Sequence, residues 1–542
     1  MNFSRVCLAI YTFLIIVLFA TACRNSTPEE NLKIFRYNQA SGITSLDPAF
    51  ASTQSNIWGV NMIFNGLVQV DSVLHILPCI AKNWEISKDG KTYTFHLRND
   101  VFFHDDSLFQ NGKGRRVVAE DFVYSFHRLI DPAVASKGSW IFNDKVDSIT
   151  PFKAVDDTTF QIHLKRAFPP LEGILTMQYC SVVPKEIVAH LGKNFRTHPV
   201  GTGPFQLKVW KEGSVLLFFK NKKYFEMDEQ QRRLPYVDGV RITFIDSKAT
   251  EFLKFRQKEY DFISDIDPSF KDDLLTKDGE LQPKYAKLLK VQKSVYLNTE
   301  YIGFNLSDTS KNNPLLKKEI RQAISYGIDK DKMMLYLRNN IGVPAWNGFV
   351  PKGLAAYDVR KVQRYHYDPQ KSRDLIRQAG YEAGNALPPI RLFCSSSAEV
   401  ICNYVVNELK QVGINASLET MQGKALNEQM IKGNAKCFRA SWIGDYPDAE
   451  NFLALFYSGY DAPPNYTRFK NERFDKMYET AFTIIDDSMR NDLYTRMDSL
   501  IMEEAPVVPL YYDQVIRFVQ NNVSGVPNNP MNLLDLKRAR IN

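Results

Sequence analysis

The chain has 542 residues, of which 24% are charged and 13% aromatic, and its formal net charge is +7. A chain of this length exceeds a single hydrophobic core, so two or three domains are expected. Basic and acidic residues are interspersed, with one basic cluster at Lys113, Arg115 and Arg116, which argues against a nucleic-acid-binding face.

The first residues have the pattern of a secretory signal. Residues 6–20, VCLAIYTFLIIVLFA, follow Arg5 and form an apolar run too short for an ordinary transmembrane helix. The Ala-Cys junction that follows resembles the lipobox of bacterial lipoproteins, in which the peptidase cuts before the cysteine and the thiol carries a diacylglycerol. We therefore expect residues 1–22 to be removed, Cys23 to be lipidated and the polar residues 24–33 to act as a tether.

The first third of the mature chain alternates strands and turns. Residues 84–98, WEISKDGKTYTFHLR, predict a hairpin around Asp89-Gly90, and residues 152–164, FKAVDDTTFQIHL, repeat the pattern. Between them, residues 119–132 carry apolar side chains at helical spacing and end at Asp131-Pro132. We expect an α+β region with a mixed or antiparallel sheet.

After about residue 300 helices and strands alternate. Asn313-Pro314 and Asp368-Pro369 are start signals for two amphipathic helices, and residues 390–394, IRLFC, read as a short buried strand. This alternation indicates an α/β region with a largely parallel sheet.

One stretch of this region, RASWIGDYPDAENF at residues 439–452, places an arginine, a tryptophan and an aspartate close together. Residues 436–443 read as a strand, and the proline at 447 keeps the residue before it out of helical geometry. Asp445 therefore falls in the loop at the carboxyl end of a strand, where open α/β sheets place their ligands. Taken alone, Arg439 and Asp445 are explained more simply by a structural ion pair or a solvated loop.

Familiar catalytic patterns are missing from the sequence. It has no Gly-x-Ser-x-Gly elbow and no phosphate-binding loop, and Gly201-Thr202-Gly203 continues into proline. The eight histidines show no ligand spacing; His104-Asp105-Asp106, beside the polar loop at residues 107–116, is the one candidate metal cluster. We therefore expect no metal, no cofactor and no catalytic residue.

The seven cysteines include two in or beside the leader, Cys7 and Cys23. The other five are an odd number, so at least one thiol stays unpaired, and these five cysteines can form one or two disulfides at most. Cys394 and Cys402 are the nearest pair in sequence, but the pairing cannot be deduced. The remaining five are Cys79, Cys180, Cys394, Cys402 and Cys437.

A series of segments from residue 43 to residue 512 carries a resemblance that none of them carries alone. They include ITSLDPAFAST, IFNGLV, LPCIAKNWEISKDGKTYTFHLRNDVFFHD, VVAEDFVYSFHRLIDP, VPKEIV, VGTGPFQLKVW, YIGFNLS, IRQAISYGIDKDKM, YDPQKSRDLIRQAGY, RASWIGDYPDAENF and EEAPVVPLYY. In this order the chain resembles the extracytoplasmic solute-binding proteins of bacterial peptide ABC importers, the oligopeptide- and dipeptide-binding group called family 5. Compared with these relatives, the loop at 107–116 is an insertion, which is either solvated or contacts a partner.

The resemblance implies an α/β, two-lobe periplasmic-binding-protein fold of type II, of the large cluster with an extra inserted α+β domain. Two crossing segments, near residues 290–305 and 495–510, would form the hinge. The implied domains are a signal peptide (1–22), a discontinuous first lobe (23–66, 196–295 and 504–542), the inserted domain (67–195) and the second, α/β lobe (296–503).

The resemblance also implies a binding site. In oligopeptide-binding relatives, the aspartate three residues after the motif tryptophan pairs with the α-amino group of the ligand, and an arginine three residues before it can meet the carboxylate. Asp445, Trp442 and Arg439 occupy these positions, and Arg439 favours longer peptides because dipeptide-binding relatives lack it. Backbone hydrogen bonds to the ligand are expected around residues 440–443 and 301–305, which adds Ser441, Ile443 and Asn305 to the expected ligand contacts.

Two of these assignments have alternatives. Trp442 could equally pack in the core. Alternation along the strand points Arg439 to the face opposite Trp442, where an internal acid could pair with it instead.

The implied function is that of a lipid-anchored, monomeric, periplasmic receptor that passes oligopeptides to a membrane permease and its ATPase. A second hypothesis keeps the fold but changes the solute to a dipeptide, a nickel chelate, haem or a sugar. A third, an envelope peptidase, would need a nucleophile or a metal centre. We expect a binding protein and not an enzyme, with no nucleic-acid partner.

Overall fold

The computed structural model describes residues 32–542 except 267, 311, 363–364 and 383–384. The leader and Cys23 lie outside the described residues. The helices are α2 (Gln54–Ile63), α3 (Ala119–Ile130), α4 (Leu171–Ile174), α5 (Lys185–Leu191), α6 (Lys248–Arg256), α7 (Lys271–Leu274), α8 (Lys318–Tyr326), α9 (Lys330–Arg338), α10 (Pro369–Gln378), α11 (Glu399–Gln411), α12 (Gly423–Lys432), α13 (Glu450–Leu453), α14 (Glu472–Ala481) and α15 (Asp487–Glu504).

The strands are distributed over one large sheet and three smaller ones. They are β1 (Ile34–Asn38), β2 (Val68–Val70), β3 (Ile76–Pro78), β4 (Ala81–Ile86), β5 (Thr92–Leu97), β6 (Phe152–Asp156), β7 (Thr159–His163), β8 (Phe205–Lys211), β9 (Val215–Lys220), β10 (Gly239–Thr243), β11 (Phe262–Ser264), β12 (Leu289–Phe304), β13 (Val343–Pro344), β14 (Ile390–Ser395), β15 (Ala416–Met421), β16 (Cys437–Ile443), β17 (Val507–Gln520), β18 (Val523–Ser524) and β19 (Arg540–Ile541).

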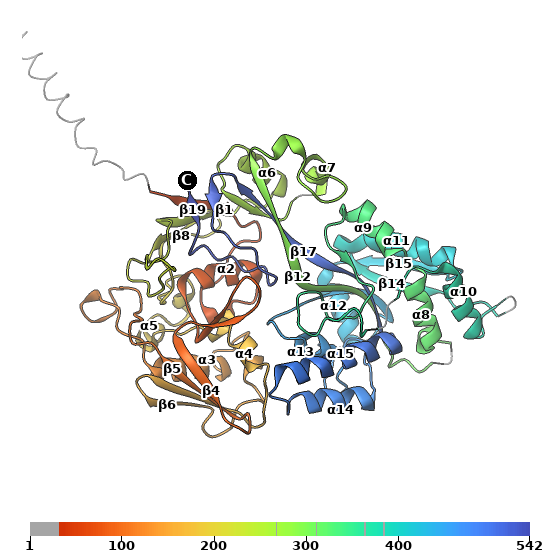
Figure 1. Ribbon diagram of the computed structural model, residues 1–542, viewed down its shortest axis with the longest axis horizontal. Helices are drawn as coiled ribbons and strands as arrows, with labels where there is room; N and C mark the ends of the chain where they lie inside the picture. Colours follow the sequence, from red (N-terminus) through yellow and green to blue (C-terminus); the bar gives the residue numbers. More distant parts are fainter. Residues whose placement is uncertain (1–31, 267, 311, 363–364, 383–384) are drawn as a thin grey trace, which may run out of the picture.

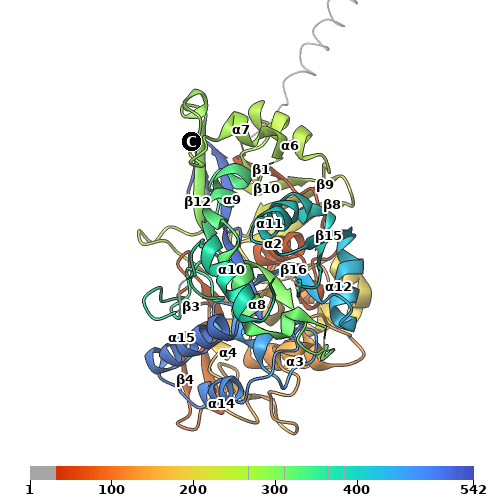
Figure 2. The ribbon, with the colours of Figure 1, turned by 90° about the vertical axis from the view of Figure 1, so that its right-hand side faces the viewer.

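Two long strands connect the halves of the molecule. The large sheet has the order β15-β14-β16-β12-β17-β11-β1-β10-β9-β8, so β12 and β17 lie at its centre. Their antiparallel ladder is interrupted between Val295 and Thr299. On one side of the interruption, β17 pairs with β11 of the first half of the molecule. On the other side, β12 pairs with β16 of the second half. Figures 1 and 2 show the two lobes on either side of these strands.

The strand expected near residues 290–305 is β12, at 289–304. The second crossing strand lies later than expected, because α15 continues to Glu504 and β17 begins at Val507. The apolar run VVPLYY belongs wholly to the strand, and the preceding acidic residues end the helix. The division of the chain at 66, 195, 295 and 503 stays a prediction.

The predicted hairpins and helices are confirmed at most positions. Residues 84–98 contribute to β4 and β5, residues 152–164 form β6 and β7, and these strands make the four-stranded antiparallel sheet β4-β5-β7-β6. The sheet of the second lobe is less parallel than expected. β14 runs parallel to β15 and β16, whereas β16, β12 and β17 are mutually antiparallel.

The described cysteines are all buried free thiols, so no disulfide joins Cys394 and Cys402. Within the described ranges no group of His, Cys, Asp and Glu could hold a metal ion. No described helix is long and apolar enough to cross a membrane. The loop at 107–116 is held against α3 and α5, since Arg115 binds both Asp121 and Glu186.

His104, which the sequence offered as a metal ligand, is a buried structural group. Its Nε2 lies 2.9 Å from the Gly203 carbonyl oxygen, and its Nδ1 lies 3.4 Å from the Gly201 amide nitrogen. This arrangement suits a neutral ring that donates from Nε2 and accepts at Nδ1. Burial lowers the His104 pKa to about 4, although the Gly203 bond and Asp105 act in the opposite direction.

This gives a prediction for stability against pH. A histidine whose pKa is lowered in the fold stabilises it fully above its unfolded pKa of about 6.5, and this contribution is lost as the pH falls towards 4. The shift corresponds to about 3 kcal/mol at most. In urea titrations from pH 7 to pH 4, His104→Gln should lose less unfolding free energy than the wild type does. His75→Gln, at an exposed position, is the matched control, and equal slopes for all three proteins would contradict the assignment.

Candidate functional site

The predicted ligand loop is held by one buried amide side chain. β16 ends at Ile443, and the Gly444 amide donates to the Leu297 carbonyl oxygen at 2.8 Å. The Asn451 Oδ1 then accepts two bonds, from the Trp442 indole Nε1 at 3.0 Å and from the Asp445 amide at 3.2 Å. The side chain of Asn451 therefore fixes the backbone of Asp445 against the end of the strand.

The Asp445 carboxylate faces solvent in a crowded environment. Its side chain is exposed, yet burial by the surrounding protein raises its pKa, while the bond to Asn451 lowers it. Tyr179 of the other lobe is close enough for its pKa to reflect this charge: burial raises it to about 12, and Asp445 adds to the increase. No lysine, arginine or histidine among the described residues forms an ion pair with Asp445.

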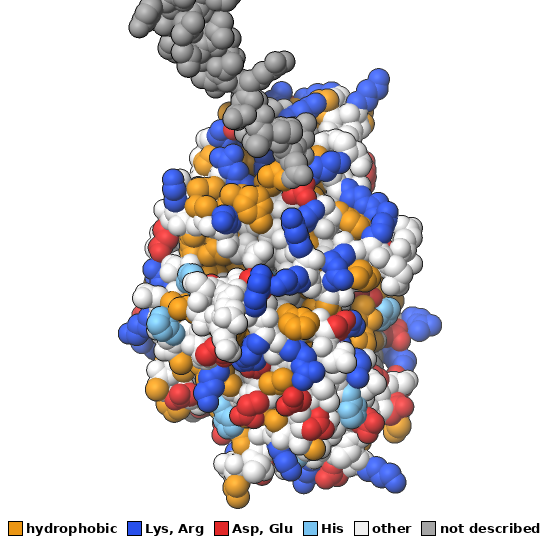
Figure 3. All heavy atoms as spheres, turned by 90° about the vertical axis from the view of Figure 1, so that its left-hand side faces the viewer, with side chains coloured by type: hydrophobic (Ala, Val, Ile, Leu, Met, Phe, Trp, Pro, Cys, Tyr) orange, Lys and Arg blue, Asp and Glu red, His pale blue; other side chains and the backbone are white. Residues whose placement is uncertain are grey.

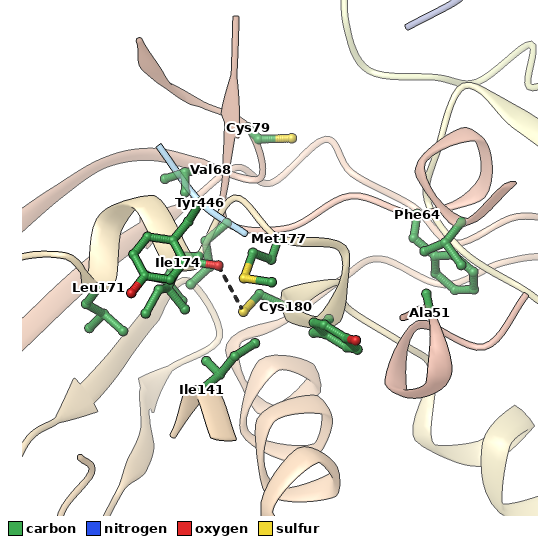
Figure 4. Close-up of a cluster of buried hydrophobic side chains, with 14 of the residues drawn as sticks. Ala51, Phe64, Val68, Cys79, Ile141, Leu171, Ile174, Met177, Cys180 and Tyr446 are labelled. Atoms are coloured by element: carbon green, nitrogen blue, oxygen red, sulfur yellow. Dashed lines mark hydrogen bonds between the residues drawn. The ribbon is translucent and has the colours of Figure 1, made fainter. Parts of the chain in front are cut away.

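The residue after Asp445 reaches the other lobe. Tyr446 is 4% exposed, and its ring lies 6.4 Å from that of Trp140 in a stacked geometry. Figure 4 shows Tyr446 beside Leu171 and Ile174, which belong to α4. The Tyr446 hydroxyl donates to the buried Glu450. The loop that carries Asp445 is thus held from both lobes.

Arg439 is paired with an internal acid. In the β12–β16 ladder Glu300 lies opposite Ser441, and the guanidinium of Arg439 binds the Glu300 carboxylate. The side chains are 16% and 7% exposed. Burial lowers the Arg439 pKa, but Glu300 and Tyr511 raise it above its ordinary value, so the guanidinium remains charged. The sequence left open whether an internal acid pairs with Arg439, and Glu300 is that acid.

A second ion pair lies beside the first, over the crossing strands. Arg338 of α9 binds Asp513 of β17 at 2.5 Å, and its guanidinium lies 4.7 Å from the centre of the Tyr511 ring. Both side chains line a cavity of 380 Å³ between the lobes, to which β11 contributes Ser264 and the following turn Asp265. The cavity floor is formed by the crossing strands themselves.

The structure brings together some of the expected residues and separates others. Arg439, Ser441 and Ile443 share one face of β16, and Ser441 and Ile443 are exposed. The Ser441 hydroxyl accepts from the Asn298 amide at 2.7 Å. Trp442 points to the other face, where it packs against the main hydrophobic cluster.

Asn305 lies apart from this group, beyond the opposite end of the β12–β16 ladder. It is 1% exposed, its Nδ2 donates to Gly433 and its Oδ1 accepts from Ser307. Residues 301–303 pair with β16 and with β17, so they have no free edge for a ligand. We therefore remove Asn305 from the expected ligand contacts.

Sequence reasoning missed Glu300, Arg338, Asp513 and Asn451. Glu300 lies in β12, one residue before the segment YIGFNLS that was singled out, and only strand pairing shows that it faces Arg439. Asp513 directly follows VVPLYY and could have been noticed as a charge in an apolar strand. No sequence pattern pointed to Arg338, because an arginine at the end of an amphipathic helix is usually a solvent-exposed residue.

The comparisons with known proteins agree with this architecture. The family model for bacterial extracellular solute-binding proteins, family 5, matches residues 75–464. The dipeptide-binding protein of Escherichia coli is 26% identical over 86% of this chain and 87% of the relative. The oligopeptide-binding protein OppA of Salmonella typhimurium is 27% identical over 90% and 88%. The probable deoxycholate-binding protein YgiS of Escherichia coli is 28% identical over 97% and 96%.

Solved structures show the same fold. The structure of HbpA2 from Haemophilus parasuis superposes with a TM-score of 0.81 at 22% identity, over 94% of this chain and all of that chain. The unliganded open form of the murein tripeptide-binding protein MppA gives 0.79 at 24% identity, over 94% and 98%. The fold is the two-lobe periplasmic-binding-protein architecture, and the chain belongs to family 5 of the bacterial extracellular solute-binding proteins.

The Glu300–Arg439 pair can be tested by a double-mutant cycle on stability. Glu300→Leu leaves a buried guanidinium without its partner and should lower the unfolding free energy by about 3 kcal/mol or more. Adding Arg439→Leu should recover most of this loss, since an apolar pair of similar size replaces the ions. Urea denaturation of the wild type, both single variants and the double variant checks this. Additive losses would show that the two side chains do not interact.

Proposed function

We propose that the protein is a lipid-anchored receptor of the bacterial cell envelope. In this proposal it binds oligopeptides between its two lobes and delivers them to an ABC permease and its ATPase. The observation that carries the proposal is Asp445, an exposed carboxylate beside the Tyr446–Trp140 contact between the lobes, without a cationic partner among the described residues. The α-amino group of a peptide would supply the missing positive charge.

The backbone of β16 offers a second element of peptide recognition. β14 pairs with this strand only at Cys437 and Phe438, so the edge of residues 439–443 opposite β12 is unpaired. An extended peptide can add to such an edge by main-chain hydrogen bonds, which do not depend on its side chains. The free edge ends next to Asp445, which supports an amino-terminal contact of the ligand there.

The ion pairs favour peptides whose carboxyl end is not fixed. The two arginines beside the cavity are each neutralised, Arg439 by Glu300 and Arg338 by Asp513. To pair with either arginine, a ligand carboxylate would have to displace one of these acids. Longer peptides, whose carboxyl end extends into water, avoid this cost, and this supports oligopeptides over dipeptides.

The similarity to a probable deoxycholate-binding protein raises a second candidate ligand, a steroid acid. Such a ligand carries a negative charge and no ammonium group. The unpaired Asp445 carboxylate would repel it if it bound at this end of β16. The peptide proposal therefore fits the charges of the site better.

The solute can be identified by mass spectrometry of ligand released from the purified protein. Short peptides of mixed sequence would support the proposal. A single defined small molecule would favour a different solute within the same fold, and turnover of added peptide would indicate an enzyme.

Asp445→Asn tests the amino-terminal contact. Removal of the partner of a desolvated ammonium should cost about 3 kcal/mol, or roughly a hundredfold in Kd. N-acetylation of the peptide should weaken binding by the wild type to a similar extent and have little further effect on the variant. Calorimetry with one peptide and its acetylated form measures both, and unchanged affinity of Asp445→Asn would contradict the assignment.

The raised pKa of Asp445 predicts how affinity depends on pH. The ionised carboxylate binds the ammonium, so affinity is complete above the Asp445 pKa of the free protein and decreases as the pH falls through it. Because that pKa lies above the ordinary aspartate value, the decrease should begin at a higher pH than for an exposed aspartate. Titration of Kd against pH checks this, and Asp445→Asn should show a flatter profile.

A further inference from the structure

One face of the large sheet is left uncovered at its β8 end. In β9 the residues Leu216 and Phe218 point inward and are fully buried, whereas Val215, Leu217 and Phe219 alternate with them and stay partly exposed. These three outward residues belong to none of the hydrophobic clusters of the described chain. A soluble sheet normally places polar residues on such a face.

The strand register shows how the outward residues are arranged. One row across the sheet contains Val209, Leu217, Arg241 and Arg36, from β8, β9, β10 and β1. A parallel row contains Phe219, Gly239 and Ile34. At Gly239 a side chain would meet Ile34 at 3.0 Å and Phe219 at 3.1 Å, so these two side chains close over the glycine. The result is a continuous apolar strip with arginines at its side.

The charges around this strip are predominantly positive. The acids near it are already paired: Asp261 with Arg36, Asp238 with Lys220, and Glu212 with Arg196. In contrast, four exposed cations on or beside the strip have no acidic partner in the described part of the chain. They are Lys208, Lys211, Lys222 and Arg241. In Figure 3, on the side where β8 lies in Figure 1, hydrophobic side chains gather with Lys and Arg around them.

The position of the chain's start connects this face to a membrane. Ile34, the first residue of β1, is itself part of the strip. Cys23 precedes it by only eleven residues in the sequence, which span about 40 Å at most when fully extended. A lipid on Cys23 would therefore hold this face close to the bilayer.

We propose that this strip, with the four free cations, lies on the surface of an anionic phospholipid bilayer. The proposal rests on the lipid anchor of the proposed function. Apolar side chains that enter the headgroup region together with cations that attract anionic lipids are the two components of interfacial membrane binding. The face would then orient the receptor, with the second lobe directed away from the bilayer.

The experiment uses the mature lipidated protein on vesicles. Because the described native cysteines are all buried, a fluorophore can be attached selectively to Val209→Cys on the strip, where the native side chain is 36% exposed. Val400→Cys, in α11 of the second lobe, is the control position, with a native side chain 69% exposed. The vesicles contain phosphatidylethanolamine with phosphatidylglycerol, or phosphatidylcholine alone, and each carries a headgroup-level quencher.

The proposal predicts strong quenching at position 209 on phosphatidylglycerol vesicles and little at position 400. Charge reversal at Lys208, Lys211 and Arg241 to Glu should reduce the quenching at 209 to the level of 400, because each cation contributes about a fivefold preference for the surface. The same reversal at Lys371, Lys410 and Lys424 of the second lobe should leave it unchanged. Equal quenching at both positions, or quenching that survives the first reversal, overturns the proposal.

Two further measurements distinguish membrane binding by this face from binding of a second copy and from the lipid anchor. Quenching that disappears when fewer protein molecules are placed on each vesicle would show that the face binds a second copy, and overturns it. Mass spectrometry of the Cys23 peptide tests the anchor independently. If no acyl chain is present, Cys23→Ser is combined with Val209→Cys so that the fluorophore is attached only at 209, and this protein mixed with phosphatidylglycerol vesicles tests the face alone: quenching at 209 upholds the proposal, and absence of quenching overturns it.

Discussion

The architecture depends on the hydrogen-bond ladder between β12 and β17. These strands form the centre of a sheet that extends into both lobes, and their pairing is interrupted between Val295 and Thr299. A continuous ladder would make the two lobes one rigid sheet, whereas two separate linkers would leave them uncoupled. The interrupted ladder allows bending at one place while the register on both sides is retained. The cavity of 380 Å³ lies over this place and is lined by residues of both lobes and of β17.

The charges over the hinge are nearly balanced before any ligand binds. Arg439 and Arg338 are matched by Glu300 of β12 and Asp513 of β17. Asp265 and Lys271, of opposite charge, line the cavity without an ion-pair partner among the described residues, and Asp445 at the end of β16 also has none. Burying charges is costly unless each is matched, so an internally neutral floor keeps the region stable when it is empty. In the proposed function, the Asp445 carboxylate would determine which end of a peptide is recognised. Under that proposal, the residues that keep the empty site stable differ from the residue that selects the ligand.

The sequence predicted most of the fold but only part of the site. The hairpins, α3, α10 and β14 follow from local periodicity and turn residues, which act over a few positions. The resemblance supplied the two lobes and the order of the segments. In contrast, the pairing of Arg439 with Glu300 depends on the register of strands 139 residues apart, and the place of Asn305 depends on which edges of β12 are occupied. Such facts become visible only after the strands are aligned.

The unpaired edge of β16 also bears on the tendency of the empty protein to aggregate at high concentration. A free strand edge is a template on which another chain can build intermolecular sheet. Here the edge covers only residues 439–443, and the loop that follows it is pinned to the opposite lobe by Tyr446. So short an edge offers another folded molecule few backbone groups for pairing. In the proposed function, the same short edge would pair with an extended peptide while offering a second copy of the protein little backbone to pair with.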